Sequence, residues 1–254
     1  MSDWVVLTLR AAVERPLEAG CIAPNRLAAL GEREISALPV RHDGRAGALG
    51  DFFTVRGERA ARVRVVGTLD GADGIGTGMS GGELVIEGNV GRDLGLEMSG
   101  GTLDVHGNAG VNAGGAPPGA ARGITGGELI IRGSVGGNVA AGMRRGLIVV
   151  TGDAGRGAGR GVIAGTVVVF GQVAPGAGRF LKRGSIVGFR EIERPATFRY
   201  ACTYRPPHLQ VLFHYLRRHR GLPVAEAHVT GRYHRYSGDL AELGRGEILQ
   251  WAGE

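Results

Sequence analysis

Few residues of this 254-residue chain combine the types and spacing that catalysis requires. His106 is the single histidine between positions 61 and 188, and it follows apolar Val105, so we expect an outward ring rather than a catalytic base. The acids of this region occupy outward positions of alternating strands, where a solvated face explains them better than a catalytic carboxylate pair. These acids are Glu83, Glu87, Asp93, Glu97 and Asp104.

Other familiar motifs fail their structural conditions. Gly74-Ile-Gly76-Thr-Gly78 resembles a phosphate-binding turn, but no helix is expected after it. Cys21 and Cys202 have no CxxC partner, which fits a reduced cytoplasmic protein. Four histidines of the last 50 or so residues lack metal-ligand spacing: His208, His214, His219 and His234. The sequence therefore predicts no catalytic residue, no metal site and no cofactor bound by this chain alone.

Arginine is the residue type whose spacing carries most information. Arg160 and Arg179 are 19 residues apart, and Arg145 and Arg183 share one position of the same period. Like charges stacked about 5 Å apart repel unless an anion or an acidic surface screens them. We therefore expect a basic column that contacts an acidic partner or a polyanionic ligand; the alternative is a hydrated arginine surface. The candidate contact residues are Arg144, Arg145, Arg156, Arg160, Arg179, Lys182 and Arg183.

These arginines lie in a repeat whose anchoring glycines are 19 residues apart, except for one spacing of 26 that places an insertion at 111–121. Apolar residues two and four positions after each anchor place one face of a short strand inward. A second glycine six positions after the anchor allows a sharp corner. The predicted structural glycines are Gly82, Gly88, Gly101, Gly107, Gly127, Gly133, Gly146, Gly152, Gly165, Gly171 and Gly184.

Stacked repeats of this kind predict an all-β fold, a right-handed parallel β-helix of about seven coils with short α/β capping segments at both ends. Disorder, the alternative for glycine-rich sequence, does not require apolar residues to keep register. We expect an N-terminal capping module at 1–60, the β-helix at 61–188, and a C-terminal helix with a partner-binding tail at 189–254. In the tail, Leu209, Leu212, Phe213 and Leu216 have helical spacing, and this helix is expected to stop at Gly221 and to close the far end of the stack.

Charge is unevenly placed along the repeat. Residues 61–131 carry a net charge of −4 and residues 132–188 a net charge of +7, within +6 for the chain. Lys182 is the single lysine, and this arginine bias indicates a GC-rich genome rather than nucleic-acid binding. The chain has no apolar run of the ~18 residues that a membrane helix needs, and its start lacks a basic signal region. We expect a cytoplasmic protein without nucleic-acid or membrane partners.

Three N-terminal segments make a family resemblance specific. They are Leu17-Glu-Ala-Gly-Cys-Ile-Ala-Pro24, Glu34-Ile-Ser-Ala-Leu38 and Leu49-Gly-Asp-Phe-Phe-Thr-Val55. With the glycine-spaced repeat, they resemble the C subunit of formylmethanofuran dehydrogenase and, equally, the C subunit of the bacterial formyltransferase/hydrolase complex. The resemblance covers nearly the whole chain. The C-terminal glycine-repeat domain of the glutamate synthase large subunit is a more distant likeness.

The resemblance implies a non-catalytic scaffold subunit that assembles with amidohydrolase-like and formyltransferase-like subunits. In the bacterial complex these pass a formyl group from formyl-tetrahydromethanopterin to a methanofuran-type carrier and release formate. The carrier's polyglutamate tail would suit the basic half of the repeat. In the dehydrogenase, the catalytic partners carry a tungsten or molybdenum pterin. Abundant arginine and alanine with almost no lysine favour the bacterial complex. An independent β-helical lyase or acyltransferase is disfavoured, because neither clustered acids nor six-residue steps occur.

Overall fold

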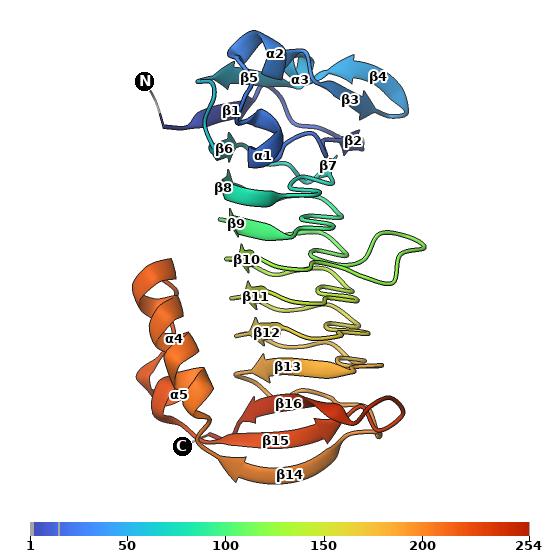
Figure 1. The fold of residues 1–254 in the computed structure, drawn as a ribbon, viewed down its shortest axis with the longest axis vertical. Helices are drawn as coiled ribbons and strands as arrows, with labels where there is room; N and C mark the ends of the chain where they lie inside the picture. Colours follow the sequence, from blue (N-terminus) through green and yellow to red (C-terminus); the bar gives the residue numbers. More distant parts are fainter. Residues whose placement is uncertain (1–2, 15, 254) are drawn as a thin grey trace.

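The computed structural model describes residues 3–14 and 16–253, which form an elongated stack of strands (Figure 1). A 12-stranded sheet runs along it in the order β14-β15-β16-β13-β12-β11-β10-β9-β8-β6-β1-β5. Its strands are β1 (Val5–Leu9), β5 (Phe53–Arg56), β6 (Arg62–Val66), β8 (Ser80–Glu87), β9 (Gly100–Val105), β10 (Glu128–Ile131), β11 (Leu147–Val150), β12 (Thr166–Val169), β13 (Arg183–Gly188), β14 (Arg199–Tyr204), β15 (Tyr233–Gly238) and β16 (Arg245–Trp251).

A second, four-stranded sheet and three short helices gather at the N-terminal end of the stack. The sheet has the order β4-β3-β2-β7, and it is formed by β2 (Leu17–Glu18), β3 (Pro39–His42), β4 (Arg45–Ala48) and β7 (Ala72–Asp73). The helices are α1 (Pro24–Leu27), α2 (Glu32–Ser36) and α3 (Leu49–Phe52). Proline in the first turn of α1 is favourable because the amide it lacks would have no intrahelical partner.

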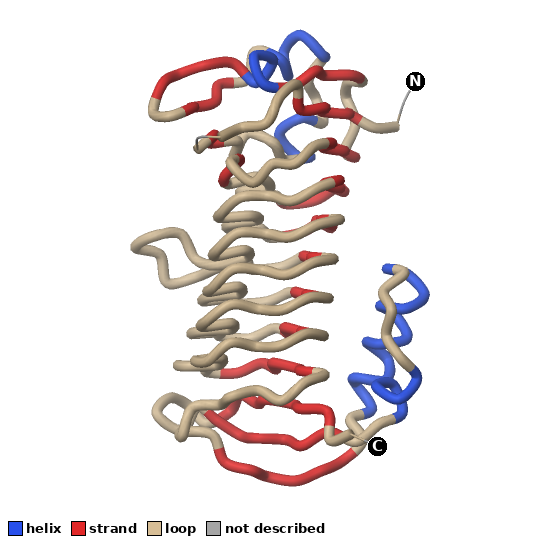
Figure 2. The backbone as a smooth tube through the Cα atoms, turned by 180° about the vertical axis from the view of Figure 1, so that it is seen from behind, coloured by secondary structure: helices blue, strands red, loops and turns tan. Residues whose placement is uncertain are grey.

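Strands β6, β8 to β13 and β16 pair in parallel, and we call this series the ladder. Its register follows the 19-residue period, so that Leu129 of β10 pairs with Ile148 of β11, which pairs with Val167 of β12. The loops between the strands also stack through single parallel bridges, from Leu69–Val90 to Val173–Ile192. Figure 2 shows these loops returning the chain from each strand to the next.

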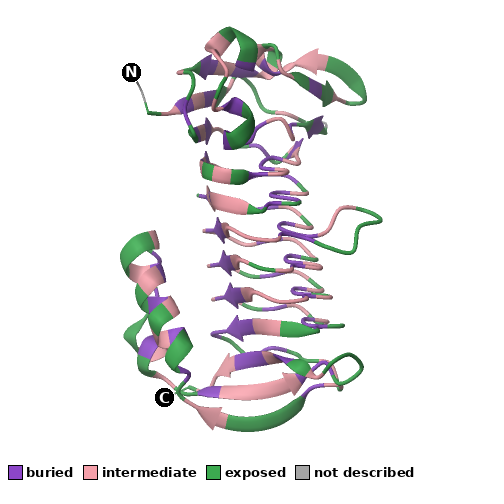
Figure 3. Cartoon of the chain, viewed as in Figure 1, coloured by how far each residue is buried: buried purple, intermediate pink, exposed green. Residues whose placement is uncertain are grey.

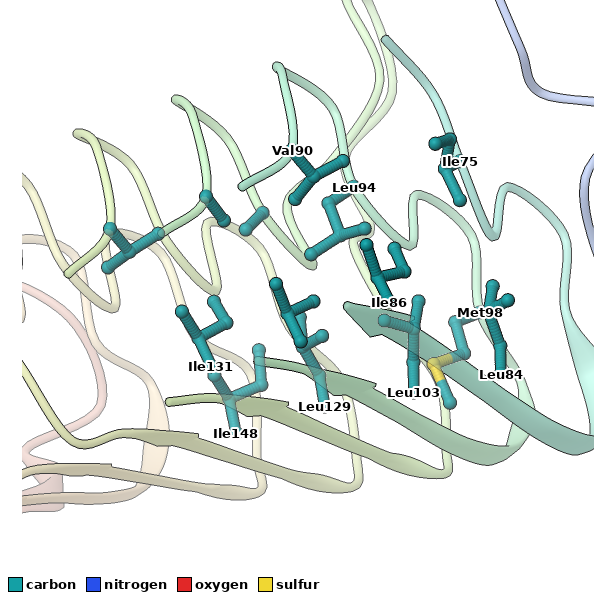
Figure 4. Packing of buried hydrophobic residues seen from close by; sticks show 14 of the residues in the cluster. Ile75, Leu84, Ile86, Val90, Leu94, Met98, Leu103, Leu129, Ile131 and Ile148 are labelled. Carbon is teal, nitrogen blue, oxygen red and sulfur yellow. The ribbon is translucent and has the colours of Figure 1, made fainter. Parts of the chain in front are cut away.

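The core lies inside the ladder. The residues two and four positions after each anchoring glycine are fully buried, as expected from the alternation. Figure 4 shows Leu84, Leu103, Leu129 and Ile148 side by side in one such column. Each strand therefore contributes its inward side chains to one continuous apolar cluster, which no single strand could form alone.

The predicted structural glycines serve two geometric purposes. The six anchors, Gly82, Gly101, Gly127, Gly146, Gly165 and Gly184, all have positive φ, between 82° and 108°. The other five lie against the backbone of the preceding turn: a Cβ at Gly152 would be 2.7 Å from the carbonyl oxygen of Gly133. Positive φ thus disfavours a side chain at all six anchors and at Gly88, and backbone of the preceding turn leaves no room for one at the second set.

Two helices follow β14. These are α4 (Pro207–Arg220), which ends at Gly221 with φ of 60°, and α5 (Glu226–Thr230). The apolar stripe of α4 packs on the outer face of the ladder beside β10 to β13, and not across its end (Figure 1). Our expectation that this helix closes the far end was therefore wrong. Strands β14 to β16 cover that end (Figure 3).

The prediction of an all-β, right-handed parallel β-helix with short capping segments was also wrong. The large sheet is mixed, because β1 pairs antiparallel with β5, and β15 pairs antiparallel with β14 and β16. The ends are not separate caps, since these strands belong to the large sheet and a second sheet lies beside it. Residues outside the repeat lack its period. The direction of the strands that they form therefore depends on which open strand edge they can pair with.

Candidate partner-binding surface

The structure brings three of the seven predicted basic contact residues into one pocket. Arg156, Arg160 and Arg179 line a pocket of about 650 Å³ with Asn138 and Phe180. The other four, Arg144, Arg145, Lys182 and Arg183, lie at or just before the starts of β11 and β13. Among the described residues, no ion pair is formed by any of the seven.

Backbone pairing explains why Arg160 and Arg179 stack. The amide of Gly142 donates to the carbonyl oxygen of Arg160 at 2.8 Å, and the amide of Gly161 donates to that of Arg179 at 2.7 Å. The two arginines therefore occupy equivalent positions on adjacent turns, as the period predicted. Both are exposed, which leaves their guanidinium groups available to bind an anion.

Phe180 is the aromatic residue between these charges. Its ring centroid lies 5.7 Å from the Arg160 guanidinium carbon and 5.3 Å from that of Arg179. These are cation–π distances, in which the ring face attracts the cation. Phe180 remains 38% exposed, so the three side chains present one basic and apolar surface to solvent.

Asp239 fixes the turn beneath this surface. Its carboxylate accepts hydrogen bonds from the amides of Phe180 at 3.0 Å and Ala241 at 2.9 Å. Burial of Asp239 acts to raise its pKa, but the Thr197 side chain, the amide donors and the nearby charge of Arg179 hold that pKa below its ordinary value. The ionised carboxylate thus holds Phe180 in place while it offsets part of the charge of one arginine.

A polar network that the sequence did not indicate anchors the C-terminal end of α4 to the ladder. Arg220 donates to Glu128 at 2.7 Å, and the hydroxyl of Tyr215 donates to the same carboxylate at 2.7 Å. Burial and the neighbouring Glu128 carboxylate raise the pKa of Tyr215. Arg132 makes two hydrogen bonds of 2.8 Å to Asp104 and a third to the carbonyl oxygen of Arg220.

This network changes the interpretation of the acidic residues. The side chain of Asp104 is only 14% exposed and paired with Arg132, so it is not part of a solvated face. Glu83 and Glu87 do lie at the surface, where they pair with Arg62 and Arg64. A signal for the buried pairs was available: Glu128 and Arg132 flank the apolar run of β10, and Asp104 lies one strand earlier.

The remaining chemical candidates stay isolated. The side chain of His106 is 46% exposed, with Nε2 3.6 Å from a carboxylate oxygen of Asp104, so its ring points outward as expected. Within residues 3–14 and 16–253, no group of three or more His, Cys, Asp or Glu side chains could hold a metal ion. In the same residues, no helix has both the length and the apolar character to cross a membrane.

Known proteins resemble the chain both in part and along its whole length. No family model matches it. Over 96 residues it is 34% identical to the C subunit of the tungsten-containing formylmethanofuran dehydrogenase 2 of Methanothermobacter thermautotrophicus, and 33% identical to that of Methanothermobacter wolfeii. Each match covers 36% of this chain and 36% of the relative's length.

A solved structure extends the similarity to nearly all residues. It is a chain in the formyltransferase/hydrolase complex of Methylorubrum extorquens, crystallised with methylofuran. The match covers 96% of this chain and 98% of that one, with a TM-score of 0.80 and 31% identity. The chain therefore belongs to the family of this component of the formyltransferase/hydrolase complex, and it is homologous to the C subunits of formylmethanofuran dehydrogenases.

Proposed function

We propose that this chain is the non-catalytic scaffold subunit of a cytoplasmic formyltransferase/hydrolase complex. The complex would pass a formyl group from formyl-tetrahydromethanopterin to a methanofuran-type carrier and release formate. The observation that carries the proposal is the match along 96% of the chain to a component of such a complex. The chain itself would bind no cofactor, and amidohydrolase-like and formyltransferase-like subunits would carry out the chemistry.

The way the chain uses its polar groups supports a scaffold role. Asp104, Glu128, Arg132 and Arg220 hold α4 on the ladder, and Asp239 holds the turn at Phe180. These charged groups are therefore engaged in structural contacts. The exposed arginines on the ladder's surface suit contact with a partner or with a carrier's anionic tail.

A second candidate is the C subunit of a tungsten- or molybdenum-dependent formylmethanofuran dehydrogenase. The partial matches to tungsten-containing enzymes favour it. Both candidates assign a scaffold role to this chain, and they differ in the chemistry of the partners. Similarity to glutamate synthase, the third possibility, would require neither a pterin nor a methanofuran-type carrier.

The test is gentle purification of the native assembly with a tag on this chain, followed by intact mass, subunit identification and metal analysis. Amidohydrolase-like and formyltransferase-like subunits without tungsten or molybdenum are the expected result. A subunit that carries a metal pterin would move the chain to the dehydrogenase. A lone monomer or homo-oligomer would contradict the scaffold role.

A further inference from the structure

Phe180 occupies a left-handed corner of the ladder where the equivalent residue is glycine in three other turns. Its φ is 64°, in the left-handed region. The equivalent positions 19 and 38 residues earlier are Gly161 and Gly142, both with φ of 67°. Gly78 and Glu97 take the same conformation in the first turns. Glycine thus occupies this left-handed corner in three turns, and Glu97 and Phe180 are the residues with large side chains there.

Phenylalanine at this corner is unfavourable for folding. A left-handed backbone brings the Cβ of an L-residue other than glycine too close to the following carbonyl oxygen. Packing offsets this only in part, because the side chain is 38% exposed and is not among the buried residues of the core. A strained residue that stays exposed at the surface indicates a role in binding and not in the stability of the fold.

The surroundings of Phe180 define what could bind there. Arg160 and Arg179 flank its ring, and Arg156 lines the same pocket. The turn that follows β15 lies beside it, and Asp239 and Ala241 of this turn line a second pocket with Arg179 and Phe180. A polyanion alone would need the arginines but would gain nothing from the exposed apolar ring of Phe180. Aromatic and arginine side chains together are typical of the centres of protein interfaces.

We propose that the surface formed by Arg156, Arg160, Arg179 and Phe180 binds an acidic segment of a partner protein. Carboxylates of the segment pair with the guanidinium groups, and one of its apolar side chains rests on Phe180. Charge complementarity supports this occupant, because residues 132–188 carry a net charge of +7. The inference rests on the proposed function in one respect: the partner is another subunit of the same assembly.

A photocrosslinker at position 180 tests the occupant directly. The full chain, with p-benzoyl-phenylalanine in place of Phe180, is expressed in its native cells, irradiated and analysed by mass spectrometry. The expected adduct is a peptide of another polypeptide with several Asp or Glu residues near the crosslink. The absence of a protein adduct, an adduct to a small anionic molecule, or a peptide without acidic residues would overturn the inference.

Charge reversal supplies a matched comparison. Arg160→Glu with Arg179→Glu should reduce the crosslink yield at least tenfold and lower the salt concentration at which the partner dissociates. Arg33→Glu with Arg45→Glu changes the net charge equally at two exposed arginines of the N-terminal end and should leave the yield within twofold. Equal losses in both variants would assign binding to overall charge and reject a defined surface.

Phe180→Gly separates binding from folding. Glycine relieves the left-handed strain while it removes the apolar contact, so the melting temperature should stay within about 4 °C of the parent. Retention of the partner should nevertheless fall at least fivefold. Unchanged retention would contradict the inference, although an intact assembly of the expected subunits would still support the proposed function. A parent chain that assembles with no partner would contradict both.

Discussion

At the scale of single residues, glycine in this protein is governed by space as much as by conformation. Gly107 does not have positive φ, yet a Cβ there would lie 2.6 Å from the carbonyl carbon of Gly88 and 2.8 Å from the amide nitrogen of Asn89. Both are backbone atoms, which cannot rotate away. The sequence pattern located such glycines correctly, but it suggested the wrong reason for some of them, namely a left-handed corner.

Gly107→Ala should therefore destabilise the protein by about 1–3 kcal/mol, because the turns must move apart to admit a methyl group. Gly81→Ala is the matched control, since a Cβ at Gly81 would meet nothing within 4 Å. Urea denaturation of both variants measures the difference in free energy of unfolding. Equal stability of the two would show that the turns tolerate a wider separation than the structure indicates.

His228 gives the fold a dependence on pH. Its ring lies 3.9 Å from the centroid of Phe189 and 4.5 Å from that of Trp251, and burial, with Arg190 nearby, lowers its pKa. A histidine with a lowered pKa in the folded state binds protons more readily when unfolded. Its stabilising contribution is thus complete above the ordinary pKa of about 6.5 and is lost as pH falls below that value.

Thermal melts of the parent and of His228→Phe between pH 7.5 and pH 5 test this. The parent should lose more stability on acidification than the variant, because phenylalanine keeps the ring contacts and cannot take up a proton. Parallel curves for the two proteins would rule out His228 as the titrating group.

At the scale of elements, α4 shows what a pattern of apolar residues can and cannot specify. Its spacing predicted the helix and its end at Gly221, and both agree with the structure. The pattern did not specify the docking surface, because an apolar stripe on a helix shows that this face is buried but not which element covers it. Strands β10, β11 and β12 are buried on both faces, and this doubly apolar composition was the available signal for the helix's position.

Phe213→Ala should cost about 3–5 kcal/mol, because the fully buried ring of Phe213 lies between α4 and the outer face of the ladder. Val211→Ala, on the helix's exposed side, should change stability by less than about 0.5 kcal/mol. Val211 is 72% exposed. Chemical denaturation followed by circular dichroism compares them, and a small effect of Phe213→Ala would mean that α4 contributes little to the fold.

At the scale of the whole molecule, the period determined which side chains face inward but not the fold class. Within 61–188 the apolar positions, the pairing register and the stacked arginines could be deduced, because each depends on a spacing along the chain. The direction of the terminal strands could not be deduced, because β14, β15 and β16 pair through contacts between residues without a repeat. The pocket at Phe180 was missed because the 19-residue period marks the stacked arginines and not the aromatic residue beside them. The division at residues 60 and 188 stays a prediction.

The long loop between β9 and β10 interrupts the 19-residue period, so its removal can show whether the ladder needs this insertion to fold. It protrudes from the stack (Figure 1), and the ladder is regular on both sides of it, with hydrogen bonds from Gly114 to Leu94 and from Thr125 to Met98. In the next turn, the residues equivalent to Gly115 and Gly123 are Ala141 and Gly142, which are consecutive. The inserted residues are therefore 116–122, and all but the last lie within the insertion predicted at 111–121.

Deletion of residues 116–122 would join Gly115 to Gly123 and restore the spacing of 19. The lost hydrogen bond from Asn112 to the carbonyl oxygen of Ala116 is a small penalty, and a shorter connection lowers the entropy of the unfolded chain. We expect the deletion variant to fold with its free energy of unfolding within about 1 kcal/mol of the parent. Urea denaturation measures this, and an unfolded product would show that the loop itself holds the adjacent turns together.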